Sequence, residues 1–117
     1  PIKFKKEIWG ISREQFASAM AAEGFPLGVG YVKPIHLMKL YQHKHVFNDT
    51  KYPFSLIEPP TQDYKKGLCS VAEWMHDKEL LTADICRLPY AAKDIDDFFT
   101  AVDKIWKEKD QLAKMEM

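Results

Sequence analysis

The stretch that decides the fold is DIDDFFTAVDKIW, residues 94–106, near the C-terminal end of the chain. Apolar residues recur in it at spacings of three and four, and mostly charged residues fill the positions between them. That period is typical of an amphipathic helix with one buried face. The apolar members of this stripe are Ile95, Phe98, Phe99, Val102, Ile105 and Trp106. We therefore expect a long helix that packs this stripe on a sheet as core, and a fraying helical tail beyond Trp106.

Three upstream segments have the patterns of strands that could form such a sheet. Residues 2–5 alternate apolar and polar, residues 27–32 read LGVGYV, and residues 81–90 begin with a second alternation. Alternation of this kind indicates half-buried strands. Because the first alternation is already under way at the start of the chain, we also expect further sequence upstream.

Between these strands the sequence predicts helices and one long connection. Ser12 and Gln15 have the spacing of a capping box, and Gly24 is a plausible stop for the helix that follows. A short helix is expected after Pro34, an irregular connection over residues 46–67, and another helix over residues 70–81. The resulting order predicts an α/β (α+β) fold, a two-layer sandwich in which a small sheet of about three strands packs against amphipathic helices.

Composition limits the classes of function. The 117 residues carry 17 basic and 17 acidic side chains, so the chain lacks the positive excess that binding to nucleic acid or an anionic membrane requires. No run approaches the roughly 20 apolar residues of a spanning helix, and the N-terminal residues do not resemble a signal peptide. We expect one domain, residues 1–117, in a cytoplasmic protein that binds neither nucleic acid nor membrane.

Histidines and cysteines are the first candidates for chemistry. His36 follows a proline on an apolar run, and His43 and His45 could share a face with each other. A metal site is not predicted, because no carboxylate or thiolate falls at ligand spacing beside them. Cys69 and Cys86 lack zinc spacing and any sequence neighbour that marks a nucleophilic thiol. We expect them to be free thiols buried in the core.

Other motifs do not support catalysis. The acidic residues at 94, 96 and 97 suit the first turn of a helix through its dipole. The sequence holds no dinucleotide fingerprint, phosphate-binding loop or serine-hydrolase elbow. From motifs alone, no catalytic residue is assigned.

Two blocks carry a family resemblance: EGFPLGVGYVKPIHLMKLYQ, residues 23–42, and GLCSVAEWMHDKELLTADICRLPYAAKDIDDFFTAVDKIW, residues 67–106. Together they resemble the C-terminal small domain of the DegT/StrS-type nucleotide-sugar aminotransferases, fold-type I enzymes that use pyridoxal phosphate. In that family a P-x-H segment precedes a C-P-V-A-E helix, a strand ending in L-P and a final amphipathic helix. The matching residues are Gly24, Pro34, His36, Cys69, Val71, Ala72, Glu73, Leu88, Pro89, Asp94 and Ile95.

The resemblance implies that this chain is one part of a larger enzyme. In the family, the lysine that forms a Schiff base with pyridoxal phosphate lies in a large domain upstream, which this chain lacks. The chain alone is therefore expected to bind no cofactor and to have no catalytic residue. Its expected role is to form one wall of the cleft for a nucleotide-linked sugar. His36 is the first candidate for substrate contact, with Tyr31 and Lys33 after it, and an ordinary structural role for all three stays open.

The chain departs from the family pattern at three positions, and two alternative functions stay open. Ser70 stands where the family usually has proline, and Ala91 and Ala92 where a cap and an acid are common. One alternative is a free-standing binding module that keeps the fold and self-associates through the surface left by the missing domain. Another is a small independent enzyme that uses His36 with Glu58 or Glu73.

Overall fold

The computed structural model describes residues 1–44, 46–47, 51–56 and 63–115 and divides the chain into two compact units. The first unit joins Pro1–Tyr31 to Asp77–Met117, and the second unit is Val32–His76. The assignment of the whole chain to a single domain stays a prediction. None of the helices in the described ranges is long and apolar enough to span a membrane.

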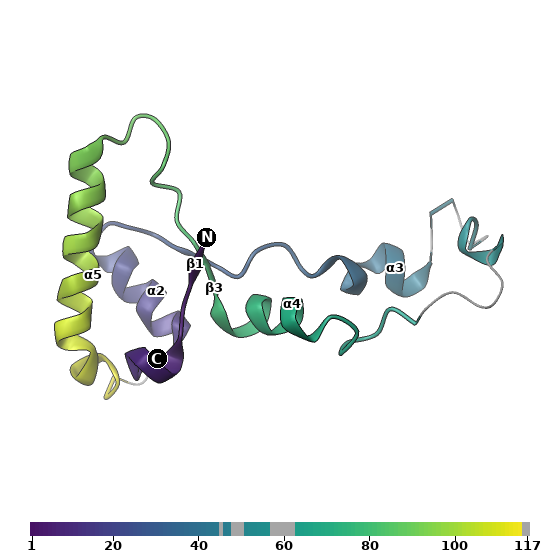
Figure 1. Ribbon diagram of the computed structural model, residues 1–117, viewed down its shortest axis with the longest axis horizontal. Coiled ribbons are helices and arrows are strands. Elements are labelled where there is room, and N and C mark those ends of the chain that lie inside the picture. The colour runs from purple at the N-terminus through teal and green to yellow at the C-terminus, as the bar shows by residue number, and fades with distance from the viewer. Residues whose placement is uncertain (45, 48–50, 57–62, 116–117) are drawn as a thin grey trace. The chain divides into compact units, whose positions relative to one another are not determined.

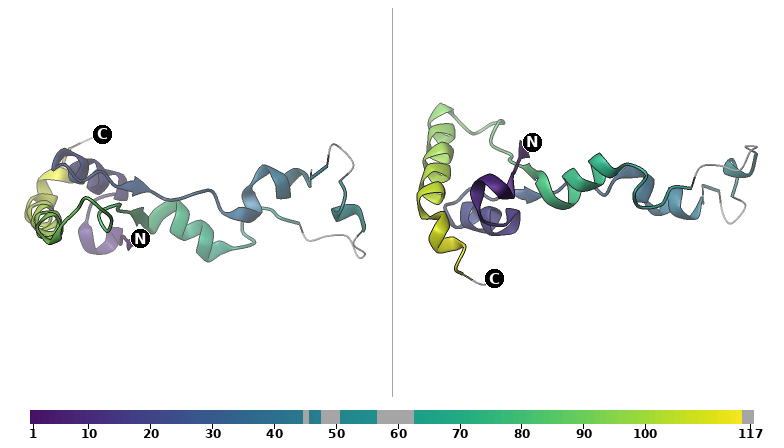
Figure 2. Two further views of the ribbon diagram at one scale, coloured as in Figure 1. Left: turned by 90° about the horizontal axis from the view of Figure 1, so that it is seen from above. Right: turned by 60° about the horizontal axis from the view of Figure 1, so that its bottom comes forward.

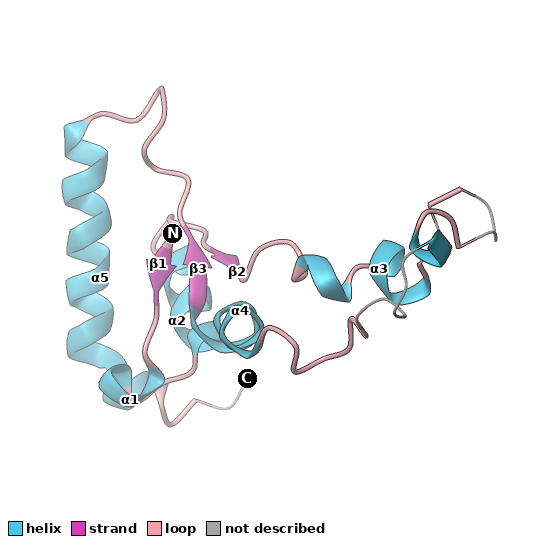
Figure 3. Ribbon diagram, turned by 45° about the vertical axis from the view of Figure 1, so that its right-hand side comes forward, coloured by secondary structure: helices cyan, strands magenta, loops and turns pink. Residues whose placement is uncertain are grey.

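The first unit is built on a three-stranded antiparallel sheet. Its strands are β1 (Ile2–Lys3), β2 (Gly28–Val29) and β3 (Leu80–Thr82), in the order β1-β3-β2. Figure 3 shows β3 between the other two. Three helices complete the unit: α1 (Lys6–Trp9), α2 (Arg13–Ala22) and α5 (Ala92–Leu112). The predicted α+β class, a small sheet packed against amphipathic helices, is confirmed.

The strands are shorter than the sequence patterns predicted. β2 covers two of the six residues of LGVGYV, and β3 ends at Thr82 although the alternation continues to Ile85. β3 pairs with β1 at Leu80 and Leu81 and with β2 at Leu81 and Thr82, and no described residue pairs with residues 83–85. Residues 83–85 therefore keep a strand-like sequence without a ladder to join.

The helix α2 follows its predicted signals. The Ser12 N–H donates to Gln15 Oε1 at 2.9 Å, and the Gln15 N–H donates to Ser12 Oγ at 3.0 Å, which confirms the capping box. The helix ends at Ala22, and Gly24 follows with φ of 93°, a conformation that favours glycine. α2 packs against α5, as Figures 1 and 2 both show.

The helix α5 buries one face, but the buried stripe is narrower than predicted. Phe98, Ala101 and Ile105 are buried in the core of the first unit. Phe99 is 60% exposed and Trp106 is 42% exposed, so their assignment to the core is wrong. Each follows a buried residue directly, and one residue turns the helix by about 100°, which carries both side chains to the edge of the stripe.

The buried face of α5 belongs to a core cluster with buried residues of α2 and β3 and of the segments just before α1 and α2. The core cluster is Phe4, Ile11, Phe16, Ala17, Met20, Leu81, Phe98, Ala101 and Ile105. α5 begins at Ala92, just before the acidic residues predicted for its first turn, and continues beyond Trp106 to Leu112, where a helical tail was predicted. The core therefore lies between the sheet and the pair α2 and α5.

The second unit contains short helical segments. A 3₁₀ turn, η1 (Ile35–Leu37), and α3 (Lys39–His43) follow Pro34, which confirms the short helix predicted there. A second 3₁₀ turn, η3 (Phe54–Leu56), is the described element of the connection predicted over 46–67. Residues 48–50 and 57–62 of that connection lie outside the described residues.

The helix predicted over residues 70–81 is a composite that ends two residues early. α4 (Ser70–Trp74) continues as a π-helical turn, η4 (Met75–Glu79). The guanidinium of Arg13, itself buried, donates to the carbonyl oxygens of Asp77 and Leu80 at 3.0 and 3.3 Å. These bonds satisfy carbonyl groups where the helix gives way to β3.

The start of α5 offers a stability prediction. The Ala91 N–H donates to Asp94 Oδ2 at 2.7 Å, but the alanine side chain cannot accept a bond in return. Ala91→Ser supplies that acceptor and is expected to stabilise the chain by about 1 kcal/mol. Thermal unfolding followed by circular dichroism measures the change, with Ala113→Ser at the other end of α5 as control. An Ala91→Ser midpoint no higher than that of the control would contradict the capping account.

Candidate functional site

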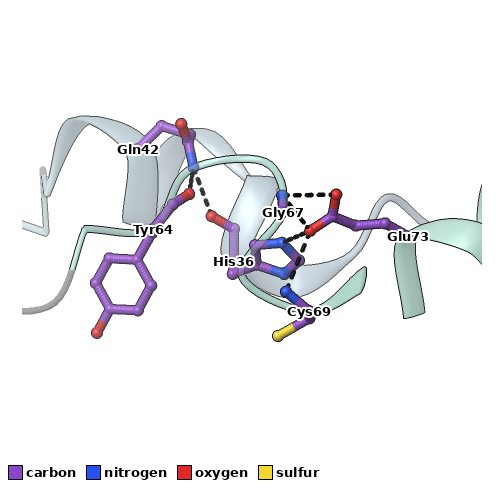
Figure 4. Close-up of polar contacts among 6 residues, drawn as sticks. All are labelled: His36, Gln42, Tyr64, Gly67, Cys69 and Glu73. Carbon is purple, nitrogen blue, oxygen red and sulfur yellow. Dashed lines mark hydrogen bonds and ion pairs between the residues drawn. The ribbon is translucent and has the colours of Figure 1, made fainter. Parts of the chain in front are cut away.

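A buried polar contact in the second unit joins His36 to Glu73. His36 lies in η1 and Glu73 in α4, and His36 Nε2 is 2.8 Å from Glu73 Oε1. Both residues are buried, with exposed fractions of 8% and 6%. Figure 4 shows the imidazole ring and the carboxylate facing each other.

Backbone groups hold the Glu73 carboxylate from the other side. The Gly67 N–H donates to both carboxylate oxygens at 2.9 Å, and the Cys69 N–H donates to Oε1 at 3.2 Å. Cys69 is the N-cap of α4, so the glutamate in the first helical turn reaches back to the turn that precedes its own helix. Gly67 has φ of 100°, which explains a glycine at this position.

The charge of Glu73 determines which ring nitrogen of His36 carries a hydrogen toward the carboxylate. Burial raises the pKa of the Glu73 carboxyl, but the bonds from Gly67, the His36 ring and Cys69 outweigh burial and hold that pKa below its usual value. The carboxyl is therefore ionised at neutral pH and can only accept hydrogen bonds. His36 Nε2 must then carry the hydrogen, and in the neutral ring Nδ1 is left as an acceptor.

A pocket of about 520 Å³ opens beside this pair. Its walls are mainly apolar, and its lining residues are Val32, Lys33, Pro34, Ile35, His36, Tyr41, Tyr64, Leu68, Cys69 and Ala72. Gln42 Nε2 donates to the carbonyl oxygen of His36 at 2.6 Å and also to that of Tyr64, as Figure 4 shows. The amide thus ties η1 to the segment of Tyr64, which also lines the pocket.

The structure brings together some of the predicted substrate residues. His36 and Lys33 both line the pocket, with Lys33 exposed and His36 buried. Tyr31 belongs to the first unit and is 72% exposed, so it is not part of this pocket. Sequence reasoning missed Tyr41 and Tyr64, whose ring centroids lie 5.2 Å apart.

The cysteines differ from their predicted placement. Cys69 and Cys86 are free thiols, as expected, but both are exposed, so the prediction that they are buried in the core is wrong. Cys69 occupies the N-cap position of α4 and lines the pocket, and Cys86 lies in the loop after β3. Helix caps and loops lie at the surface, which explains the exposure.

A second pocket, of about 330 Å³, belongs to the first unit. Its described lining is mostly apolar and comes from β1, α1, α2, α5 and the segments after β1 and β3. Lys3 is the charged side chain in that lining, and it pairs with Glu79 at 3.1 Å. Among the described residues, no group of three histidine, cysteine or acidic side chains could hold a metal ion, and His45 lies outside that range.

No protein-family model matches this chain. Neither a curated protein nor a solved structure gives a significant match. The family resemblance therefore rests on the ordered sequence motifs.

Proposed function

We propose that this chain is the C-terminal small domain of a pyridoxal-phosphate-dependent nucleotide-sugar aminotransferase of the DegT/StrS type. In the whole enzyme it forms one wall of the cleft that admits the nucleotide-linked sugar. Closing such a wall excludes water and aligns the reactants. The enzyme is cytoplasmic in this proposal.

One observation supports the proposal most. The P-x-H histidine and the V-A-E glutamate belong to the two blocks that carry the resemblance, and they lie 37 residues apart in sequence. They meet in a single buried pair, at 2.8 Å. If the resemblance of the two blocks arose by chance, there would be no reason for a polar residue of one block to bond to a polar residue of the other. Such a bond is expected if the domain uses both blocks to build one pocket.

The described residues of this chain do not fit pyridoxal phosphate by themselves. The cofactor needs a lysine for its Schiff base and a carboxylate or equivalent partner for its pyridine nitrogen. Lys3 and Lys33 line the two pockets, but no carboxylate lines either of them. Cofactor binding and amino transfer therefore belong to the large domain, and the chain alone is expected to be inactive.

The test is a substitution in the complete enzyme. His36→Asn removes the imidazole. The KM for the nucleotide-linked sugar is expected to rise about tenfold, because one hydrogen-bonded contact with the substrate is lost. Cofactor loading, measured by absorbance, should be retained. His43→Asn, on an exposed histidine of the same unit, is the matched control. Equal KM values for the His36 variant, the control and the unchanged enzyme would contradict the proposed substrate wall.

A further inference from the structure

The pocket of the second unit has an unusual distribution of polarity. Five of its lining side chains are aliphatic and two are tyrosines, and the remaining three are Lys33, His36 and Cys69. A sugar ring carries several hydroxyl groups, and each loses free energy when buried without a partner. Such walls favour a flat ring with few polar groups instead. Aromatic side chains bind flat heterocycles by stacking.

One acceptor in this pocket has an open position. His36 Nε2 is committed to Glu73, and no described residue bonds to Nδ1, as Figure 4 illustrates. Among the described residues, no fully buried side-chain nitrogen or oxygen lacks a partner. Nδ1 therefore reaches accessible surface although the imidazole is nine-tenths buried, with 9% of the side chain exposed. The pocket is the cavity that His36 lines.

We propose that this pocket binds the base of the nucleotide-linked sugar, with the ring against the tyrosine wall of Tyr41 and Tyr64 and one ring N–H donated to His36 Nδ1. The assignment of this ring to a nucleotide sugar rests on the proposed function. Glu73 acts as a positioning residue, because it holds the tautomer of His36 that presents an acceptor. Lys33, exposed at the pocket, is the cation in its described lining and is available to the phosphate groups that follow the base.

Other parts of the substrate fit this pocket less well. A phosphate group requires several donors, whereas Nδ1 of the neutral imidazole is an acceptor and Lys33 is the one cation in the described lining. A thiol reaction at Cys69 is also disfavoured, because its sulfur forms no hydrogen bond with the imidazole in the described structure. The base alone matches both the apolar walls and the single acceptor.

The test compares two ligands that differ only at the donor. The ¹⁵N-labelled chain is titrated with uridine and with 3-methyluridine, which lacks the ring N–H. Uridine should shift the amide signals of the pocket and the Nδ1 resonance of His36. 3-Methyluridine should bind about tenfold more weakly, the loss of one hydrogen bond. This comparison needs no variant and does not depend on folding of an altered chain.

A pair of variants tests the aromatic wall. Tyr41→Leu should weaken uridine binding about tenfold, since base stacking on an aromatic ring is lost. Tyr90→Leu, which changes a tyrosine of the first unit, should leave the affinity for uridine unchanged. Three results would overturn the proposal. They are equal affinity for the two nucleosides, no change in the amide signals with uridine up to its solubility, and signal changes confined to the first unit. Because the KM test of His36→Asn concerns the whole substrate, it can succeed while this assignment to the base fails.

Discussion

Leu81→Ala is expected to destabilise the first unit by about 3 kcal/mol, the largest effect of a single truncation that we predict. Leu81 is fully buried in β3, the central strand, where it pairs with Ile2 of β1 and Val29 of β2. Its truncation removes apolar contacts and leaves a cavity that short strands cannot close without losing register. Urea unfolding followed by tryptophan fluorescence measures the loss.

A matched leucine controls for the change in residue type. Leu88 belongs to the same unit and is 90% exposed, so Leu88→Ala should change the free energy of unfolding by no more than about 0.5 kcal/mol. Similar losses for the two variants would contradict the placement of Leu81 at the centre of the core.

Glu73→Ala is expected to have the largest effect in the second unit. It leaves the Gly67 N–H, the Cys69 N–H and the His36 ring without the acceptor that holds them. Hydrogen exchange at the Gly67 and Cys69 amides should accelerate roughly tenfold or more, since each loses a bond to a charged oxygen. Amide exchange measured by nuclear magnetic resonance reports both positions separately.

The control for this variant is another carboxylate of the second unit. Asp63 is exposed and pairs with Lys65 at 3.1 Å, so Asp63→Ala removes a surface ion pair that contributes little. Its effect on the same two amides should be small. Unchanged exchange in Glu73→Ala would show that the carboxylate does not organise this turn.

Local signals predicted the helices better than the strands. The capping box at Ser12 and the apolar period after Asp94 are short-range patterns, and α2 and α5 follow them. Strand length depends instead on where neighbouring strands pair, and alternation within one segment does not carry that information. The alternation through Ile85 therefore predicted a longer strand than β3.

The candidate site was predictable only in part for a similar reason. His36 stood out beside a proline on an apolar run, but its partner Glu73 is 37 residues away, and no spacing rule connects them. Tyr41 and Tyr64 come together only through the fold of the second unit. Cys69 and Cys86 were placed in the core from residue type alone, whereas their positions at a helix cap and in a loop decide their exposure.

The central claim is that this chain is the small domain of a larger pyridoxal-phosphate enzyme. The most direct test is the intact mass of the native polypeptide, isolated from its own cells after borohydride reduction. The account predicts a mass well above 13.6 kDa, with one pyridoxyl group fixed to a lysine upstream of this chain. A native polypeptide of 13.6 kDa, or a larger one without a pyridoxyl-lysine, would contradict it.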